Sequence, residues 1–109
     1  MGRFNEFIWP VECPACGAAE TLPFQGYIGL LQWETFQKGE DVFGREPQHR
    51  RPQLGPEASL EGRSFWAYGL GDCPRCKAVL WARIEVRDGR FEQLLLVPEP
   101  ANMYDWGRL

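Results

Sequence analysis

The sequence predicts a small, mainly β fold formed by one domain. The first observation is length, because 109 residues are enough for a single core that buries roughly two-thirds of the unfolded surface. The second is composition, since 44% hydrophobic and 14% aromatic residues are too many for a disordered chain, while 12 Gly and 9 Pro predict many turns. The third is periodicity, because apolar residues nowhere keep helical spacing over several turns.

A hairpin in the last third of the chain is the most regular predicted element. Residues 79–86 and 91–97 are strand-like and flank Asp88-Gly89, which favours a two-residue type I′ turn because both positions take positive φ. Trp81 lies far from this turn, where both faces of the hairpin are apolar, so we expect another segment to cover the second face. The predicted cross-strand pairs are Arg87 with Arg90, Val86 with Phe91, Ile84 with Gln93, Ala82 with Leu95 and Leu80 with Val97.

Three further strands are expected, at residues 21–24, 28–36 and 65–70. In the second of these runs Leu31 and Trp33 alternate with polar neighbours, which is typical of a half-buried strand. The third run leads directly into a pair of cysteines. Its apolar face is formed by Trp66, Tyr68 and Leu70.

Residues 44–62 have neither helical nor strand periodicity. They contain three Pro and three Gly and few apolar anchors, so we expect a flexible loop inserted into a single domain of residues 1–109. The only His of the chain, His49, lies in this loop, where a His is usually solvated. No nucleophile motif accompanies it, and we therefore expect no enzymatic activity.

Charge and hydropathy limit the classes of partner. The formal net charge is −3, which disfavours strong binding to nucleic acid. No window approaches 18 consecutive apolar residues, and the first residues are too polar for the core of a signal peptide. We expect a cytoplasmic bacterial protein that binds no membrane, and the excess of Arg over Lys is typical of a GC-rich genome.

All four cysteines lie in two Cys-x-x-Cys motifs, Cys13-Pro14-Ala15-Cys16-Gly17 and Cys73-Pro74-Arg75-Cys76-Lys77. Each tight loop can present two thiolates to a metal, and two such loops complete a tetrahedron. Gly17 can take the left-handed conformation that turns backbone amides toward sulfur. Lys77 holds the equivalent place in the second motif without the freedom of Gly.

These motifs resemble the knuckle of zinc-ribbon and rubredoxin-type proteins, in which Cys-Pro-x-Cys-Gly is followed by a β-hairpin. The resemblance implies a zinc-ribbon-like core with one structural zinc ion, whose ligands are Cys13, Cys16, Cys73 and Cys76. The stretch between knuckles is usually shorter in that family, whereas 56 residues (73 − 16 − 1) separate them here. An inserted β region must therefore fold back onto the site.

Two other interpretations of the cysteines stay open. A rubredoxin-like iron site would use the same tetrahedral sulfur geometry and would make the protein an electron carrier. Either Cys-x-x-Cys pair could instead exchange disulfides, as isolated pairs of this kind do. Zinc is favoured because two pairs argue for coordination, and a closed shell of four thiolates leaves no position for substrate.

The aromatic residues predict an interaction role for the protein. Trp33, Trp66 and Trp81 occupy apolar strand positions, which places them in the core. We expect a protein partner, contacted by Trp9, Tyr104 and Trp106 with Arg50 and Arg51 at the rim. The alternatives are a zinc ribbon that binds nucleic acid, the electron carrier, and an immunity protein or antitoxin that neutralises a toxin.

Overall fold

The computed structural model describes residues 4–31, 33–43, 53–54 and 63–109. Its regular elements are all β-strands, and no helix occurs among the described residues, as the sequence predicts. Within this described part nothing is helical, long and apolar enough to cross a membrane. The strands are β1 (Asn5–Glu12), β2 (Ala19–Gly26), β3 (Leu30–Leu31), β4 (Thr35–Phe36), β5 (Gln53–Leu54), β6 (Phe65–Asp72), β7 (Val79–Arg87), β8 (Arg90–Val97) and β9 (Trp106–Arg108).

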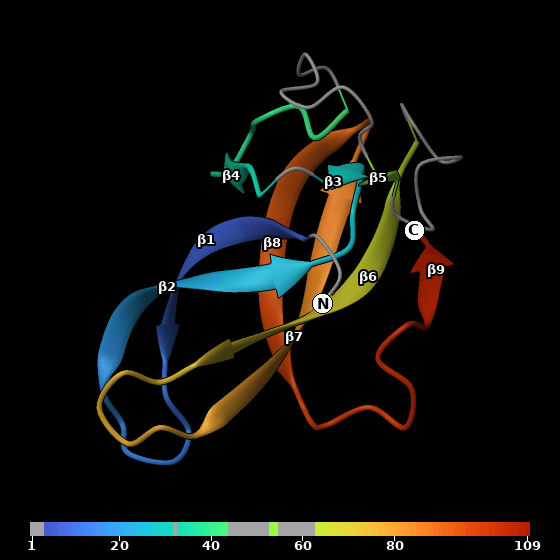
Figure 1. Ribbon diagram of the computed structural model, residues 1–109. Coiled ribbons are helices and arrows are strands. Elements are labelled where there is room, and N and C mark those ends of the chain that lie inside the picture. Colours follow the sequence, from blue (N-terminus) through green and yellow to red (C-terminus); the bar gives the residue numbers. More distant parts are fainter. Residues whose placement is uncertain (1–3, 32, 44–52, 55–62) are drawn as a thin grey trace.

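A curled seven-stranded sheet contains every strand except β3 and β5, which pair with each other. Its order is β4-β1-β2-β6-β7-β8, with β9 on the same edge of β6 as β2. The strands β2 and β6 share only the pairs Gln25↔Leu70 and Gly26↔Gly69. Beyond these two pairs the β1–β2 hairpin turns away from the edge of β6 and runs across β6, β7 and β8 (Figure 1). This crossing brings the β1–β2 and β6–β7 turns to the same end of the molecule.

The β1–β2 hairpin is called the crossing hairpin below, and β6, β7 and β8 together are called the larger sheet. The core fills the space between the two. Phe7 of β1 is at its centre, with its ring 5.5 Å from the ring of Phe36 and 5.1 Å from that of Phe91. Burial of these rings removes a large apolar area from water, which is the main favourable term of folding. The other fully buried aromatic side chains are Phe24 and Phe65.

The predicted Asp88-Gly89 turn is confirmed. Both residues have positive φ, at 53° and 76°, and the turn is flanked by the expected pairs Arg87↔Arg90 and Val86↔Phe91. The hairpin is further anchored by Ser64, whose hydroxyl accepts the backbone N–H of Asp88 at 3.2 Å.

The predicted register beyond Phe91 is wrong by one residue. The register shifts between Glu85 and Val86 because β8 contributes one extra residue, Glu92, as a β-bulge. The shift turns Leu94 into the core and leaves Leu95 45% exposed. It also places Gln93 on the outer face, where its amide donates to Glu85 at 2.7 Å. The observed pairs are Glu85↔Gln93, Ile84↔Leu94, Arg83↔Leu95, Ala82↔Leu96 and Trp81↔Val97.

The segment predicted as one strand at residues 28–36 is divided into β3 and β4. Trp33, between them, has a φ of 58° and an exposed side chain, so the prediction that it belongs to the core is wrong. The segment is held by the buried Asn5, whose amide donates to the Ile28 carbonyl at 2.8 Å and accepts the Glu34 N–H at 3.1 Å. Trp66 and Trp81 are half-buried.

Most of the predicted loop at residues 44–62 lies outside the described residues, and so does His49. Two residues of this stretch form β5, which pairs with β3 through Leu30↔Leu54 and Leu31↔Gln53. The expectation that the stretch has no strand is therefore wrong at this point. A strand of two residues is too short to show a period in the sequence. Its partner strand is also far away along the chain, so no local turn signal marks the pair.

Candidate metal centre

The two Cys-x-x-Cys motifs form turns of the same geometry. In the first turn, Cys13 donates its backbone N–H to the Ala18 carbonyl at 2.9 Å, and Gly17 donates to the Cys13 carbonyl at 2.8 Å. In the second, Cys73 donates to Ala78 and Lys77 donates to Cys73, both at 2.9 Å. Each residue of the second turn lies 60 positions after its equivalent in the first. The two turns therefore present their cysteines in the same way.

The residue after each second cysteine takes the left-handed conformation. Gly17 has a φ of 76°, which costs Gly nothing, whereas Lys77 has a φ of 65°. A non-Gly residue in this region is strained, typically by about 1 kcal/mol or more. The second turn thus keeps the knuckle geometry against a local cost, which indicates that the rest of the fold imposes it.

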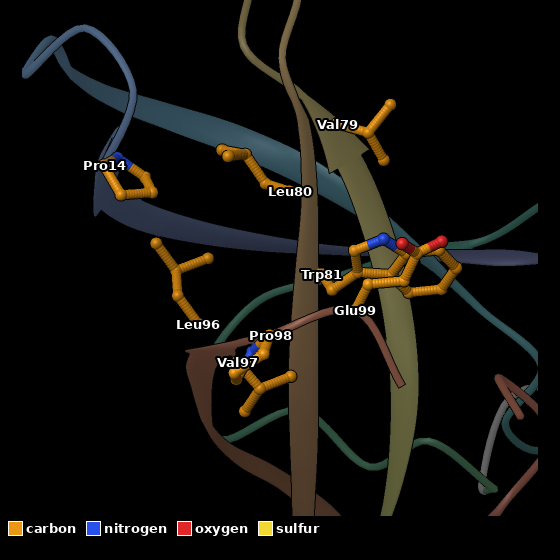
Figure 2. Close-up of a pocket in the computed structure, with 8 residues that line it drawn as sticks. All are labelled: Pro14, Val79, Leu80, Trp81, Leu96, Val97, Pro98 and Glu99. Carbon is orange, nitrogen blue, oxygen red and sulfur yellow. The ribbon is translucent and has the colours of Figure 1, made fainter. Parts of the chain in front are cut away.

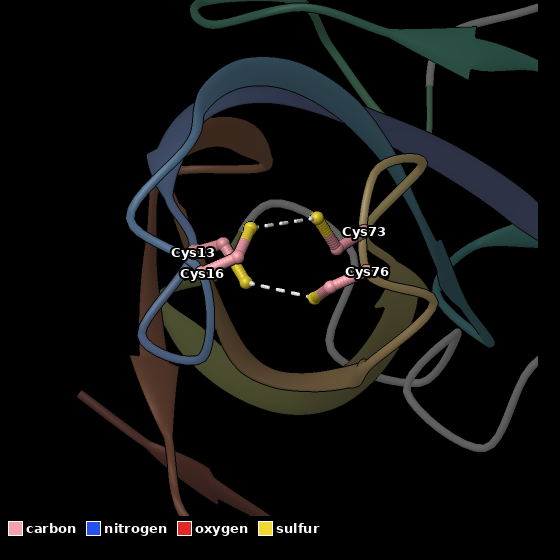
Figure 3. Close-up of side chains that lie close together, drawn as sticks. All are labelled: Cys13, Cys16, Cys73 and Cys76. Carbon is pink, nitrogen blue, oxygen red and sulfur yellow. Dashed lines mark hydrogen bonds between the residues drawn. The ribbon is translucent and has the colours of Figure 1, made fainter.

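The four sulfur atoms lie at one site between the turns (Figure 3). The Sγ atoms of Cys13 and Cys76 are 3.7 Å apart, as are those of Cys16 and Cys73, and all four lie within 4.8 Å of one another. A tetrahedral zinc site with metal–sulfur bonds of about 2.3 Å has sulfur–sulfur edges of about 3.8 Å. A disulfide would need about 2.05 Å. The cysteines are all free, and their spacing fits a four-thiolate metal ion.

Burial differs within each cysteine pair. Cys13 and Cys73, the first residues of the motifs, are buried against the core, whereas Cys16 and Cys76 are exposed. A hollow of about 380 Å³ on this exposed side is lined by both turns, including Arg75. The site is thus attached to the core on one side and lies at the surface on the other.

Electrostatics also favour a cation among the sulfurs. The backbone N–H groups of Cys76 and Arg75 donate to the Cys73 sulfur and lower the pKa of that thiol to about 6. The Ala18 N–H lowers the pKa of Cys16, but burial and the neighbouring cysteine sulfurs raise it more, to about 12. Four sulfurs this close cannot all ionise by themselves, because like charges disfavour the second and later thiolates. A divalent metal supplies the missing positive charge.

An ion pair spans the two hairpins beside the sulfurs. The Arg75 guanidinium donates from Nε to Glu20 Oε1 at 2.8 Å, which raises the pKa of Arg75. Sequence reasoning identified neither residue as part of the site. Arg75 lies inside the second turn, and Glu20 lies two residues after Ala18, which closes the first turn.

Three of the predicted partner-binding residues, Trp9, Tyr104 and Trp106, lie among the described residues. Trp9 is half-buried and packs against the core, with its ring 5.5 Å from that of Phe91. Tyr104 is 60% exposed and lies 5.9 Å from the Tyr27 ring, while Trp106 in β9 is 38% exposed. Arg50 and Arg51 lie outside the described residues.

No protein-family model, no curated protein and no solved structure matches this chain. The interpretation of the site therefore rests on the four sulfur positions and on the two turns that hold them. Both are compatible with a zinc-ribbon-like metal site.

Proposed function

We propose that the chain is a small cytoplasmic zinc protein in which one structural zinc ion holds a zinc-ribbon-like core, and that it acts as a protein-interaction module. The observation that carries the metal assignment is the set of sulfur distances, 3.7 Å between Cys13 and Cys76 and between Cys16 and Cys73. These distances match the edges of a tetrahedron of thiolates around zinc.

The positions of the four cysteines in the fold support a structural role for the proposed metal ion. Cys13 and Cys16 belong to the crossing hairpin, whereas Cys73 and Cys76 belong to the larger sheet. A metal bound by both pairs ties together two parts of the chain whose strands share only two residue pairs. Four thiolates complete the coordination shell, which leaves no open position for a substrate and supports a role without catalysis.

The interaction role is supported by the exposed aromatic residues near the C-terminus. Tyr104 and Trp106 are large and apolar, and exposed aromatic side chains of this kind are frequent anchors in protein interfaces. Trp9, half-buried against the core, would offer only part of its ring to a partner.

Metal analysis of the purified full chain tests the metal assignment. Native mass spectrometry together with elemental analysis is expected to give one zinc ion per chain. One iron ion per chain and a red colour would instead assign a rubredoxin-like electron carrier. A metal-free chain with two disulfides would refute the metal site.

A further inference from the structure

The strand β8 forms one edge of the sheet in the described part of the chain. It is the last strand in the sheet order, and β7 is its only ladder partner among the described residues. Near the turn, the segment around Glu40 covers this edge, since Phe91 donates to the Glu40 carbonyl at 3.0 Å and accepts from Gly39 at 2.7 Å. From Gln93 to Val97, none of the strands in the described part of the chain pairs with it.

The direction of the backbone groups on this edge follows from the ladder. Cys73, directly after β6, donates its backbone N–H to the carbonyl of Ala78, directly before β7. Ala78 thus turns its backbone groups toward β6, and successive residues of a strand turn them to opposite sides. Even-numbered residues of β7 therefore form hydrogen bonds with β6, and odd-numbered residues form them with β8. Because Glu85, Arg83 and Trp81 pair with Gln93, Leu95 and Val97, the N–H and C=O groups of Leu94 and Leu96 point outward.

An apolar groove of about 620 Å³ continues this edge toward the metal site. Figure 2 shows Leu80 and Leu96 on the side of β7 that faces Pro14 of the first knuckle. The ladder of β7 with β8 ends at Trp81↔Val97, so Val79 has no ladder partner on that side among the described residues, and it lines the groove. Glu99 is the only charged residue among those that line the groove.

The edge carries no charge along Gln93–Val97 but has a carboxylate at each end. Glu92 precedes it and is partly engaged by Arg87 at 3.5 Å, whereas Glu99 has no ion-pair partner among the described residues. Natural edge strands are usually protected by charges, a bulge or a short length. Here the bulge at Glu92 lies at the turn end of β8, and the uncharged edge beyond it lies between two acidic groups in a chain of net charge −3.

These charges distinguish between two possible partners for the β8 edge, a second copy of this chain and a segment of another protein. In an antiparallel pair of two copies centred on Leu95, the outward groups of Leu94 would meet those of Leu96. Glu92 of one copy would then face Pro98 of the other and lie one residue from its Glu99. Like charges at this distance disfavour the dimer, whereas basic residues in the same positions would be attracted.

We propose that β8 binds, as an added strand, an extended segment of a partner protein that has alternating apolar side chains and a basic residue near each end. The backbone groups of Leu94 and Leu96 form the new ladder, and the groove takes the apolar side chains that point toward it. Glu92 and Glu99 are seven residues apart in the sequence, which sets a partner segment of about eight residues. This inference rests on the proposed interaction role but not on the surface at Tyr104 and Trp106.

The test uses the metal-loaded full chain and a synthetic peptide, Lys-Val-Thr-Val-Thr-Val-Thr-Lys, with its Glu-ended counterpart as control. Titration followed by NMR is expected to shift the amide signals of Leu94 and Leu96, and the Lys-ended peptide should bind at least tenfold tighter. In the variant Leu96→Pro the outward N–H is lost, while the ladder to β7 keeps its bonds. Leu96→Ala removes the same side chain but keeps this N–H, so it should bind at least tenfold tighter than Leu96→Pro.

Charge reversal provides an independent test if Leu96→Pro does not fold. Glu99→Lys should weaken the Lys-ended peptide and strengthen the Glu-ended one, each by several fold. Absence of shifts at Leu94 and Leu96, equal binding of both peptides, or a dimer of the unbound chain in sedimentation would overturn the proposal. If any of these results is found with one zinc ion per chain, the metal assignment stands. Failure of the strand-binding proposal is therefore distinguishable from failure of the metal assignment.

Discussion

Ile84 of β7 occupies the space that the missing side chain of Gly26 leaves in β2. A Cβ atom added to Gly26 would lie 2.9 Å from Ile84 Cδ1 and 3.2 Å from Phe7 Cε2. A Cβ atom added to Gly69, the partner of Gly26 in β6, would lie closer still, 2.6 Å from Ile84 Cδ1. The two glycines allow the crossing hairpin to approach the larger sheet while a full Ile side chain stays between them.

Gly26→Ala is therefore expected to destabilise the fold by about 1–3 kcal/mol, because the new methyl group overlaps the end of Ile84. The double variant with Ile84→Val removes Cδ1, so its cost should be smaller than the sum of the two single changes. Gly69→Ala is the control, since its Cβ would also lie 2.7 Å from the Gln25 carbonyl oxygen, which Ile84→Val does not move. Urea unfolding measures all four variants; strict additivity for Gly26→Ala with Ile84→Val would contradict this packing.

Cys73→Ser should destabilise the whole fold by several kcal/mol. Loss of one buried thiolate would weaken binding of the proposed metal ion, and the binding energy of a structural metal contributes to folding. Circular dichroism on heating measures the loss, and a zinc-sensitive dye measures release of the ion. Arg75→Ala is the control, because it changes the same turn without removing a ligand. An unchanged melting temperature for Cys73→Ser would mean that the cysteines do not support the fold.

The ion pair of Arg75 and Glu20 should contribute little by itself. The two side chains are 70% and 29% exposed, and exposed pairs are typically worth less than about 1 kcal/mol. A double-mutant cycle with Arg75→Ala and Glu20→Ala, followed by urea unfolding, gives the coupling energy. The coupling should fall further at high salt, because screening weakens exposed pairs. A coupling above about 2 kcal/mol would show that the pair is part of the metal site's support.

Gly89→Val should destabilise the β7–β8 hairpin by about 1 kcal/mol or more. Gly89 has a φ of 76°, which a β-branched residue resists. Asp88→Asn is the matched control, because Asn tolerates the φ of 53° found at that position. Chemical denaturation compares the two variants. If Val at position 89 costs no more than Asn at position 88, the turn type assigned here is wrong.

Alanine at both Tyr104 and Trp106 should weaken a complex with the protein partner by more than about 1 kcal/mol while zinc content and melting temperature stay unchanged. The partner is first isolated with the tagged protein from its own host and then purified for calorimetry. Leu109→Ala is the control, since Leu109 is also exposed near the C-terminus. Normal binding by the double variant would remove these residues from the interface.

Two features of this protein were predictable because they depend on neighbours in the chain. The Cys-Pro-x-Cys turns require only a few consecutive residues to present two sulfurs, and Asp88-Gly89 requires only two residues that accept positive φ. The motifs also predicted that the four cysteines meet, because a tetrahedral metal needs four ligands and the chain has four.

The strand β1 was not predicted, although it carries the first knuckle. Pro10 interrupts its pattern, and proline normally argues against a paired strand. The polar Asn5 gave no strand signal either, because its burial depends on the Ile28 carbonyl and the Glu34 amide, which only the fold brings near.

Local backbone preference and local spacing are sufficient to predict the β class, the turn at Asp88-Gly89 and the two cysteine turns. The Glu92 bulge, which places Leu94 rather than Gln93 in the core, could not be predicted in this way. Neither could the crossing of β2 over β6 at Gly26 and Gly69. Both depend on which side chains fill one shared volume, and that volume exists only after strands distant in sequence have packed together.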